Sequence, residues 1–106
     1  LIPWKDAIPI EPAEIRRIEV AHTLPRIVEP EIAGPITWTV EYRLPLDLIA
    51  VYCPGARRPA PGVSWRANLY KCADDTSHPH WLTWAPVDRP APDFHRPECF
   101  GTLAFE

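Results

Sequence analysis

The sequence contains little cysteine and little glycine. Three cysteines and four glycines are present among 106 residues. Cys53, Cys72 and Cys99 form no C-x-x-C pair, so nothing supports a zinc or thioredoxin-type site. Three cysteines cannot all pair within one chain. We expect buried free thiols, with one disulfide and one remaining thiol as the alternative.

The sequence also lacks a basic excess and a long apolar run. With 11 basic and 14 acidic residues, its net charge is −3. This balance argues against a dedicated nucleic-acid surface, which usually shows a basic stripe. No apolar run approaches the roughly 18 residues of a transmembrane helix, so we expect no membrane span.

Motifs typical of enzymes are missing as well. There is no Gly-x-Ser-x-Gly elbow, no phosphate loop and no dinucleotide fingerprint. Glycoside hydrolysis would need a pair of carboxylates. The candidates are Glu29, Glu31, Glu41, Asp74 and Asp75. No spacing singles out two of them, and we expect no catalysis by this chain alone.

Proline, in contrast, is abundant, with 15 residues. Proline breaks helices and central strands, so these residues divide the chain into short pieces and leave no long helical period. We therefore predict an all-β fold, an antiparallel β-sandwich. Residues 1–106 would form a single domain or part of one, beginning with an extended arm over residues 1–14 that Trp4 could anchor.

The clearest strand prediction covers residues 36–44. Apolar and polar side chains alternate there, which is typical of an antiparallel strand with one buried face. The apolar positions are Ile36, Trp38, Val40, Tyr42 and Leu44. Trp38 is accordingly expected in the core.

A second pair of predicted strands holds three of the five tryptophans. Residues 63–70 alternate, with Trp65 expected in the core. Residues 81–85 form the second strand, and the polar residues 74–79 connect the two. Trp81 and Trp84 would lie on opposite faces of that second strand, so one of them would be buried and the other exposed.

Shorter patterns complete the prediction. Strands are expected at residues 15–22 and 100–105, with a short edge strand at residues 27–28. Residues 46–50 would form one helical turn or a short strand, and residues 52–62 a surface loop.

Roughly five or six strands are fewer than the seven or more of a complete sandwich. Half a sandwich would leave one apolar face bare, and monomers rarely tolerate a large bare patch. We therefore expect the sandwich to be completed by the remainder of a parent polypeptide or by a second copy of the chain.

Four segments in order resemble the carboxy-terminal half of the family 9 carbohydrate-binding modules, with the family-9-like domains of gut Bacteroidetes proteins as the nearest likeness. They are Trp38-Thr-Val-Glu-Tyr-Arg-Leu-Pro-Leu46, Trp65-Arg-Ala-Asn-Leu-Tyr-Lys71, His80-Trp-Leu-Thr-Trp-Ala-Pro86 and Phe94-His-Arg-Pro-Glu-Cys-Phe-Gly-Thr-Leu-Ala-Phe105. The Pro-x-x-Phe-Gly-Thr-Leu ending is the most specific of them. The resemblance covers residues 18–106.

The resemblance implies a jelly-roll-like sandwich that binds sugar without catalysis. Such modules accompany polysaccharide-degrading proteins, and the likeness favours a periplasmic or extracellular location. Family domains carry further amino-terminal strands, and their binding sites draw residues from both halves. The carboxy-terminal half would therefore hold part of a site.

Sugar binding stacks a pyranose on an aromatic ring, with polar groups fixing its hydroxyls. The candidate residues are Trp81, Trp84, Phe94, His95, Asp74, Asp75, Arg66 and Tyr70. Phe94 matches the aromatic residue that family members place shortly before the Pro-x-x-Phe-Gly-Thr-Leu ending. It would either stack against the sugar or only pack within its loop. Arg66 and Tyr70 would share one strand face with Asn68, either a binding face or simply its wet side.

Metal binding has little support in the sequence. Asp74 and Asp75 could help hold a calcium ion, but could equally be solvated loop carboxylates. His78 and His80 could share a metal, yet no spacing supplies a third ligand. We predict no metal site and no cofactor. The alternative function is a structural or interaction module that has lost sugar binding.

Overall fold

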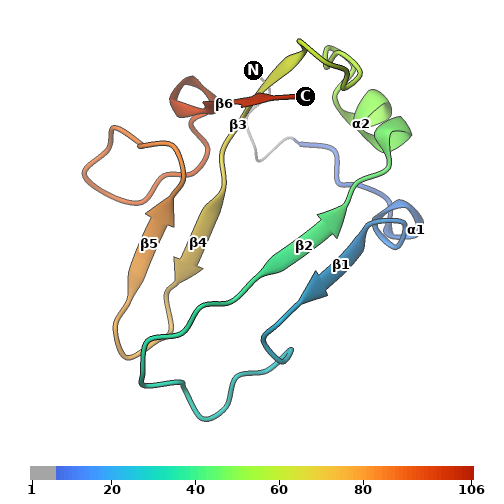
Figure 1. Ribbon diagram of the computed structural model, residues 1–106. Helices are drawn as coiled ribbons and strands as arrows, with labels where there is room; N and C mark the ends of the chain where they lie inside the picture. Colours follow the sequence, from blue (N-terminus) through green and yellow to red (C-terminus); the bar gives the residue numbers. More distant parts are fainter. Residues whose placement is uncertain (1–6) are drawn as a thin grey trace. The chain divides into compact units, whose positions relative to one another are not determined.

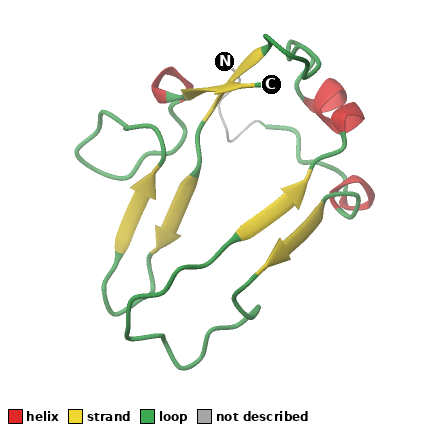
Figure 2. Ribbon diagram, in the orientation of Figure 1, coloured by secondary structure: helices red, strands yellow, loops and turns green. Residues whose placement is uncertain are grey.

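The computed structural model describes residues 7–106, and Figure 1 traces their path. It contains three two-stranded antiparallel sheets and short helices (Figure 2). This confirms the predicted all-β class and is consistent with an incomplete sandwich. The chain divides into two compact units, Leu1–Ala56 and Arg57–Glu106, and each is described by itself.

The described part of the first unit has one sheet, with one helical segment before it and one after it in the chain. Its elements in order are α1 (Pro12–Ile15), β1 (Glu19–His22), β2 (Val40–Arg43) and α2 (Leu46–Tyr52). Strands β1 and β2 pair antiparallel, from Glu19 opposite Arg43 to His22 opposite Val40. The Thr23 amide donates to the Thr39 carbonyl at 3.1 Å and extends the pairing by one step.

The two helical segments of this unit are tied together by side chains. Arg17 donates to Glu14, in α1, at 2.7 Å and to Asp47, in the first turn of α2, at 2.6 Å. The Tyr52 hydroxyl accepts a hydrogen bond from the Glu11 amide at 3.3 Å. Helix α2 buries Leu48, which is 5% exposed.

The second unit contains two sheets. Strand β3 (Ser64–Ala67) pairs with β6 (Gly101–Ala104), and β4 (Tyr70–Ala73) pairs with β5 (His80–Thr83). A short 3₁₀ helix, η2 (Pro97–Cys99), precedes β6. In the register, Trp65 lies opposite Leu103 and Cys72 opposite Trp81. The predicted polar connection at residues 74–79 and the closing strand are confirmed.

The predicted strand at residues 63–70 is in fact two strands with different partners. The break falls at Asn68, whose side-chain amide donates to the Ala85 carbonyl at 3.0 Å and accepts from the Ala85 amide at 2.8 Å. At this position, hydrogen bonds from the Asn68 side chain take the place of the backbone hydrogen bonds that join paired strands. The chain can therefore leave β6 after Ala67 and pair with β5 from Tyr70 onward.

The first unit departs from prediction near its amino end. Helix α1 occupies residues 12–15, which were expected to be partly arm and partly strand. Proline is favoured in the first turn of a helix because its fixed φ suits that turn, and Pro12 stands there. Trp4 lies outside the described residues. Residues 27–28 form no strand, whereas residues 46–50 are helical.

The expected core position of Trp38 is wrong for this chain. The apolar stripe of residues 36–44 is 38–51% exposed at Ile36, Trp38, Val40, Tyr42 and Leu44. Only the second half of the predicted strand, β2, is paired. Nothing in the described part of the first unit buries this stripe. Trp65 is half-buried and packs edge-on against Phe105, with ring centroids 4.9 Å apart.

The three cysteines are free, but they are not the buried thiols that we predicted. Cys53 and Cys72 are exposed and Cys99 is half-buried. In β4 the buried position is Ala73. Successive strand side chains point to opposite faces, so Cys72 is turned away from the buried side.

Candidate functional site

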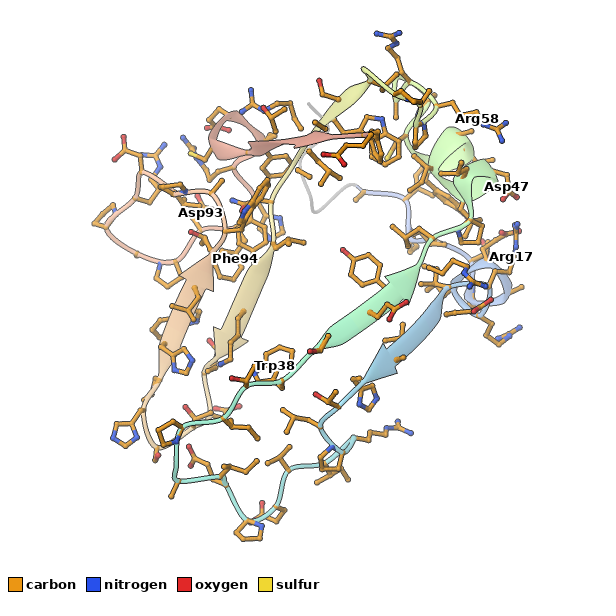
Figure 3. The ribbon with its side chains drawn as sticks, in the orientation of Figure 1. Arg17, Trp38, Asp47, Arg58, Asp93 and Phe94 are labelled. Carbon is orange, nitrogen blue, oxygen red and sulfur yellow. The ribbon has the colours of Figure 1, made fainter. Side chains whose placement is uncertain are left out.

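A pocket of about 240 Å³ lies in the second unit, between β5 and the proline-rich loop that follows it. Trp81 and Thr83 contribute from β5, where they occupy alternate positions and so share one face. The loop supplies the other wall, through Val87, Arg89, Pro90, Ala91, Pro92, Asp93 and Phe94. Figure 3 labels Asp93 and Phe94.

Phe94, one of the two aromatic residues that line the pocket, packs against a residue outside the lining. The Phe94 ring stacks on the Tyr70 ring, with centroids 4.3 Å apart and planes inclined by 22°. Tyr70 stands in β4, opposite Thr83 of β5. One face of Phe94 is thereby covered by Tyr70. The Tyr70 hydroxyl is buried without a hydrogen bond in the described structure.

The other aromatic wall, Trp81, is held by the turn between β4 and β5. Its indole N–H donates to Asp74 Oδ1 at 2.9 Å. The Trp81 side chain is 41% exposed. A ring with one anchored edge and open surface can stack against a flat apolar face.

Polar groups complete the lining. Thr83, Arg89 and Asp93 supply a hydroxyl, a guanidinium and a carboxylate. Asp93 Oδ1 also accepts a hydrogen bond from the His95 amide at 3.2 Å. Two aromatic walls with a few polar groups form the kind of pocket that orients a hydroxylated ligand.

Of the predicted site residues, the pocket brings together Trp81 and Phe94. Tyr70 and Asp74 lie behind them as supports, a position that the sequence did not indicate. Asp75 and His95 are not part of the lining. Their contacts with sugar, like those of Trp81 and Phe94, stay predictions.

Two other predicted site residues also lie outside the lining and contact the protein itself. The Arg66 guanidinium donates to the carbonyls of Phe100 and Glu98. Trp84 is 52% exposed and lies against Gly101, where an added Cβ would be 2.9 Å from Trp84 Cζ3. The prediction that one of Trp81 and Trp84 would be buried is wrong, since both are exposed. Trp84 follows the end of β5 rather than standing in it.

Sequence reasoning missed three polar lining residues, Thr83, Arg89 and Asp93. Thr83 could have been found, because it stands two positions after Trp81 in a predicted strand. Arg89 and Asp93 belong to an irregular loop. No periodic pattern indicates which loop side chains face a strand.

The His78-Pro79-His80 segment does not assemble a metal centre. His80 Nε2 lies 2.6 Å from Lys71 Nζ, and His80 Nδ1 lies 2.8 Å from the His78 carbonyl oxygen. Both ring nitrogens of His80 are therefore engaged by protein groups. Within residues 7–106, no three histidine, cysteine or acidic side chains are grouped as metal ligands.

Arg17 and Asp47 form an exposed ion pair in the described part of the first unit. The hydrogen bond from Arg17 lowers the pKa of Asp47, and the same bond raises the pKa of Arg17 (Figure 3). These residues border a hollow of about 420 Å³ together with Glu11, Ala13, Glu14, Leu48, Val51 and Tyr52. In the described part of the chain, no helix is long and apolar enough to cross a membrane.

The aromatic pocket and the antiparallel sheets agree with a comparison to protein families. Residues 11–105 match carbohydrate-binding family 9. The chain belongs to carbohydrate-binding family 9. This membership indicates carbohydrate binding in general, and it fits a role without catalysis. The comparison with curated proteins found no match, and the comparison with solved structures found none either.

Proposed function

We propose that this family 9 chain binds a glycan through the pocket of its second unit, as a non-catalytic module in polysaccharide breakdown. The observation that supports the proposal best is the meeting of Trp81 and Phe94 in one pocket with three polar side chains. The ligand is one pyranose unit of an oligo- or polysaccharide. A pocket of about 240 Å³ is small beside typical ligand sites of roughly 300–1,000 Å³, and so suits a single ring.

The charges of the pocket favour a neutral sugar. Arg89 and Asp93 contribute one positive and one negative group. A guanidinium donates hydrogen bonds and a carboxylate accepts them, so together they serve the two roles of a hydroxyl. A carboxylated sugar would gain an attraction to Arg89 but would meet a repulsion from Asp93.

Titration of the protein with neutral oligosaccharides, followed by tryptophan fluorescence and calorimetry, tests the proposal. We expect Trp81→Ala to weaken binding about tenfold or more, because the lost apolar contact corresponds to roughly 1.4 kcal/mol or more. The matched control is Trp84→Ala, which removes an exposed tryptophan outside the pocket lining. Equal losses in both variants, or no binding of any plant or host glycan by the wild type, would contradict the proposal.

A second candidate function is an interaction module that kept the fold and lost the sugar site. The exposed apolar stripe of residues 36–44 favours it. Such a face suits completion by another part of a parent polypeptide or by a second copy of the chain. Association without any glycan response would support this candidate, whereas a saturable glycan response that Trp81→Ala removes would exclude the loss of sugar binding.

A further inference from the structure

We propose that Tyr70 and Asp74 are positioning residues that hold the two aromatic walls of the pocket in their binding orientation. Neither residue lines the pocket, yet each contacts one of its rings. This inference rests on the proposed function, since it says how the same site is prepared for its ligand.

Tyr70 fixes Phe94 through the stacking of their two rings. Phe94 stands near the end of the irregular loop of residues 84–96, outside any strand. Tyr70, in contrast, belongs to β4 and is paired with β5, the strand that carries Trp81. The stack at 4.3 Å therefore couples the loop wall of the pocket to its strand wall.

The ring of Tyr70, rather than its hydroxyl, performs this role. The hydroxyl is buried and has no hydrogen-bond partner in the described structure. Burying a hydroxyl without a partner is unfavourable, so it adds nothing to the stack. Phenylalanine at this position would keep the ring and remove the unpaired group, which makes Tyr70→Phe a conservative variant.

Asp74 fixes Trp81 from the turn between β4 and β5. The hydrogen bond from indole Nε1 to Asp74 Oδ1, at 2.9 Å, holds the ring edge of a half-exposed side chain. Without it the ring could reorient about two side-chain torsions. Rings that are already ordered lose less conformational freedom when a ligand binds, so affinity rises without any new contact.

Two pairs of variants test the proposal in the intact chain, with the neutral oligosaccharides of the fluorescence titration as probes. Tyr70→Phe should bind within about twofold of wild type, and Tyr70→Leu about fivefold more weakly. Asp74→Asn keeps an acceptor oxygen and should bind like wild type, whereas Asp74→Ala should bind about threefold more weakly. Asp75→Ala, a neighbouring carboxylate outside the pocket lining, is the matched control.

A second readout reports ring motion without ligand. In NMR relaxation measurements, Asp74→Ala should increase the motion of the Trp81 indole N–H, and Tyr70→Leu should increase the motion of the Phe94 ring. Asp75→Ala should change neither. Increased ring motion separates positioning from a merely stabilising role, which would lower the unfolding midpoint and leave the ring motion unchanged.

The outcomes distinguish this inference from the proposed function. Wild-type binding with unchanged affinity in Tyr70→Leu and Asp74→Ala would overturn positioning and leave the proposed function intact. Absence of wild-type binding would overturn the proposed function, and unchanged ring motion would then refute ring positioning as well. If Tyr70→Leu does not fold, the Asp74 variants decide the matter, because that residue stands at an exposed turn.

Discussion

Asp74 and Asp75 show how differently adjacent residues of one type can be used. Both were candidates for sugar or calcium contacts in a polar turn. Asp74 accepts the Trp81 indole hydrogen bond, while Asp75 has no part in the pocket lining. The chemical type of a residue limits its possible roles, and the direction of its side chain selects among them.

At the same scale, the Arg17–Asp47 pair predicts a pH dependence. The pKa of Asp47 is lower in the folded chain than its ordinary value, because Arg17 donates a hydrogen bond to the carboxylate. The folded state therefore binds fewer protons than the unfolded state in this range. The contribution of the pair is present above about pH 4 and is lost as the pH falls through the lowered pKa of Asp47.

Asp47→Asn should therefore be slightly less stable than wild type at neutral pH, and the difference should vanish in acid. Urea unfolding followed by circular dichroism at several pH values measures it. The groups are exposed, so the difference should also shrink in high salt. In an Arg17→Gln background the substitution should have almost no effect. If the stability difference between wild type and Asp47→Asn stayed the same in acid, the ion pair would not be the cause of that difference.

At the scale of elements, Asn68 determines where one strand ends and another begins. Its side chain bonds both backbone groups of Ala85, and its Oδ1 also accepts from the Leu69 amide at 2.9 Å. Asn68→Ala leaves these backbone groups without their partner. We expect a loss of about 1–3 kcal/mol in the free energy of unfolding.

Unfolding in urea, followed by tryptophan fluorescence, measures this loss. Asn68→Asp keeps the Oδ1 acceptor and loses the Nδ2 donor, so it should bring a carboxylate against the Ala85 carbonyl and also destabilise. Ser64→Ala, at an exposed position of β3, is the control and should stay within about 0.5 kcal/mol of wild type. A near-neutral Asn68→Ala would mean that the strand break does not depend on this amide.

At the scale of the whole molecule, the notable feature is exposed apolar surface. The stripe of residues 36–44 is exposed at all five apolar positions, including Trp38. Its alternation is that of a strand with one covered face. The described part of the first unit therefore leaves the residues predicted as core uncovered.

We expect the isolated chain to self-associate as its concentration rises, because an uncovered apolar face is removed from water on association. Sedimentation velocity at increasing protein concentration measures this. Trp38→Ser should reduce association, whereas Glu41→Gln, at an alternating polar position, should not. A chain that stays monomeric at high concentration would contradict the expectation.

The sequence by itself determined the all-β class, the polar connection at residues 74–79 and the strand after it, the closing strand and the family likeness. Alternation, proline punctuation and short motifs are local signals, and each can be interpreted within a few residues. They also indicated Trp81 and Phe94 as candidates, although nothing local brought the two into one pocket.

Tertiary structure decided the rest. It ended β3 at Ala67, placed Arg89 and Asp93 in the pocket lining and put Tyr70 behind Phe94. Each of these features depends on which loop returns to which strand. Contacts between side chains far apart in the sequence determine which loop packs against which strand, and a local sequence pattern does not predict such contacts.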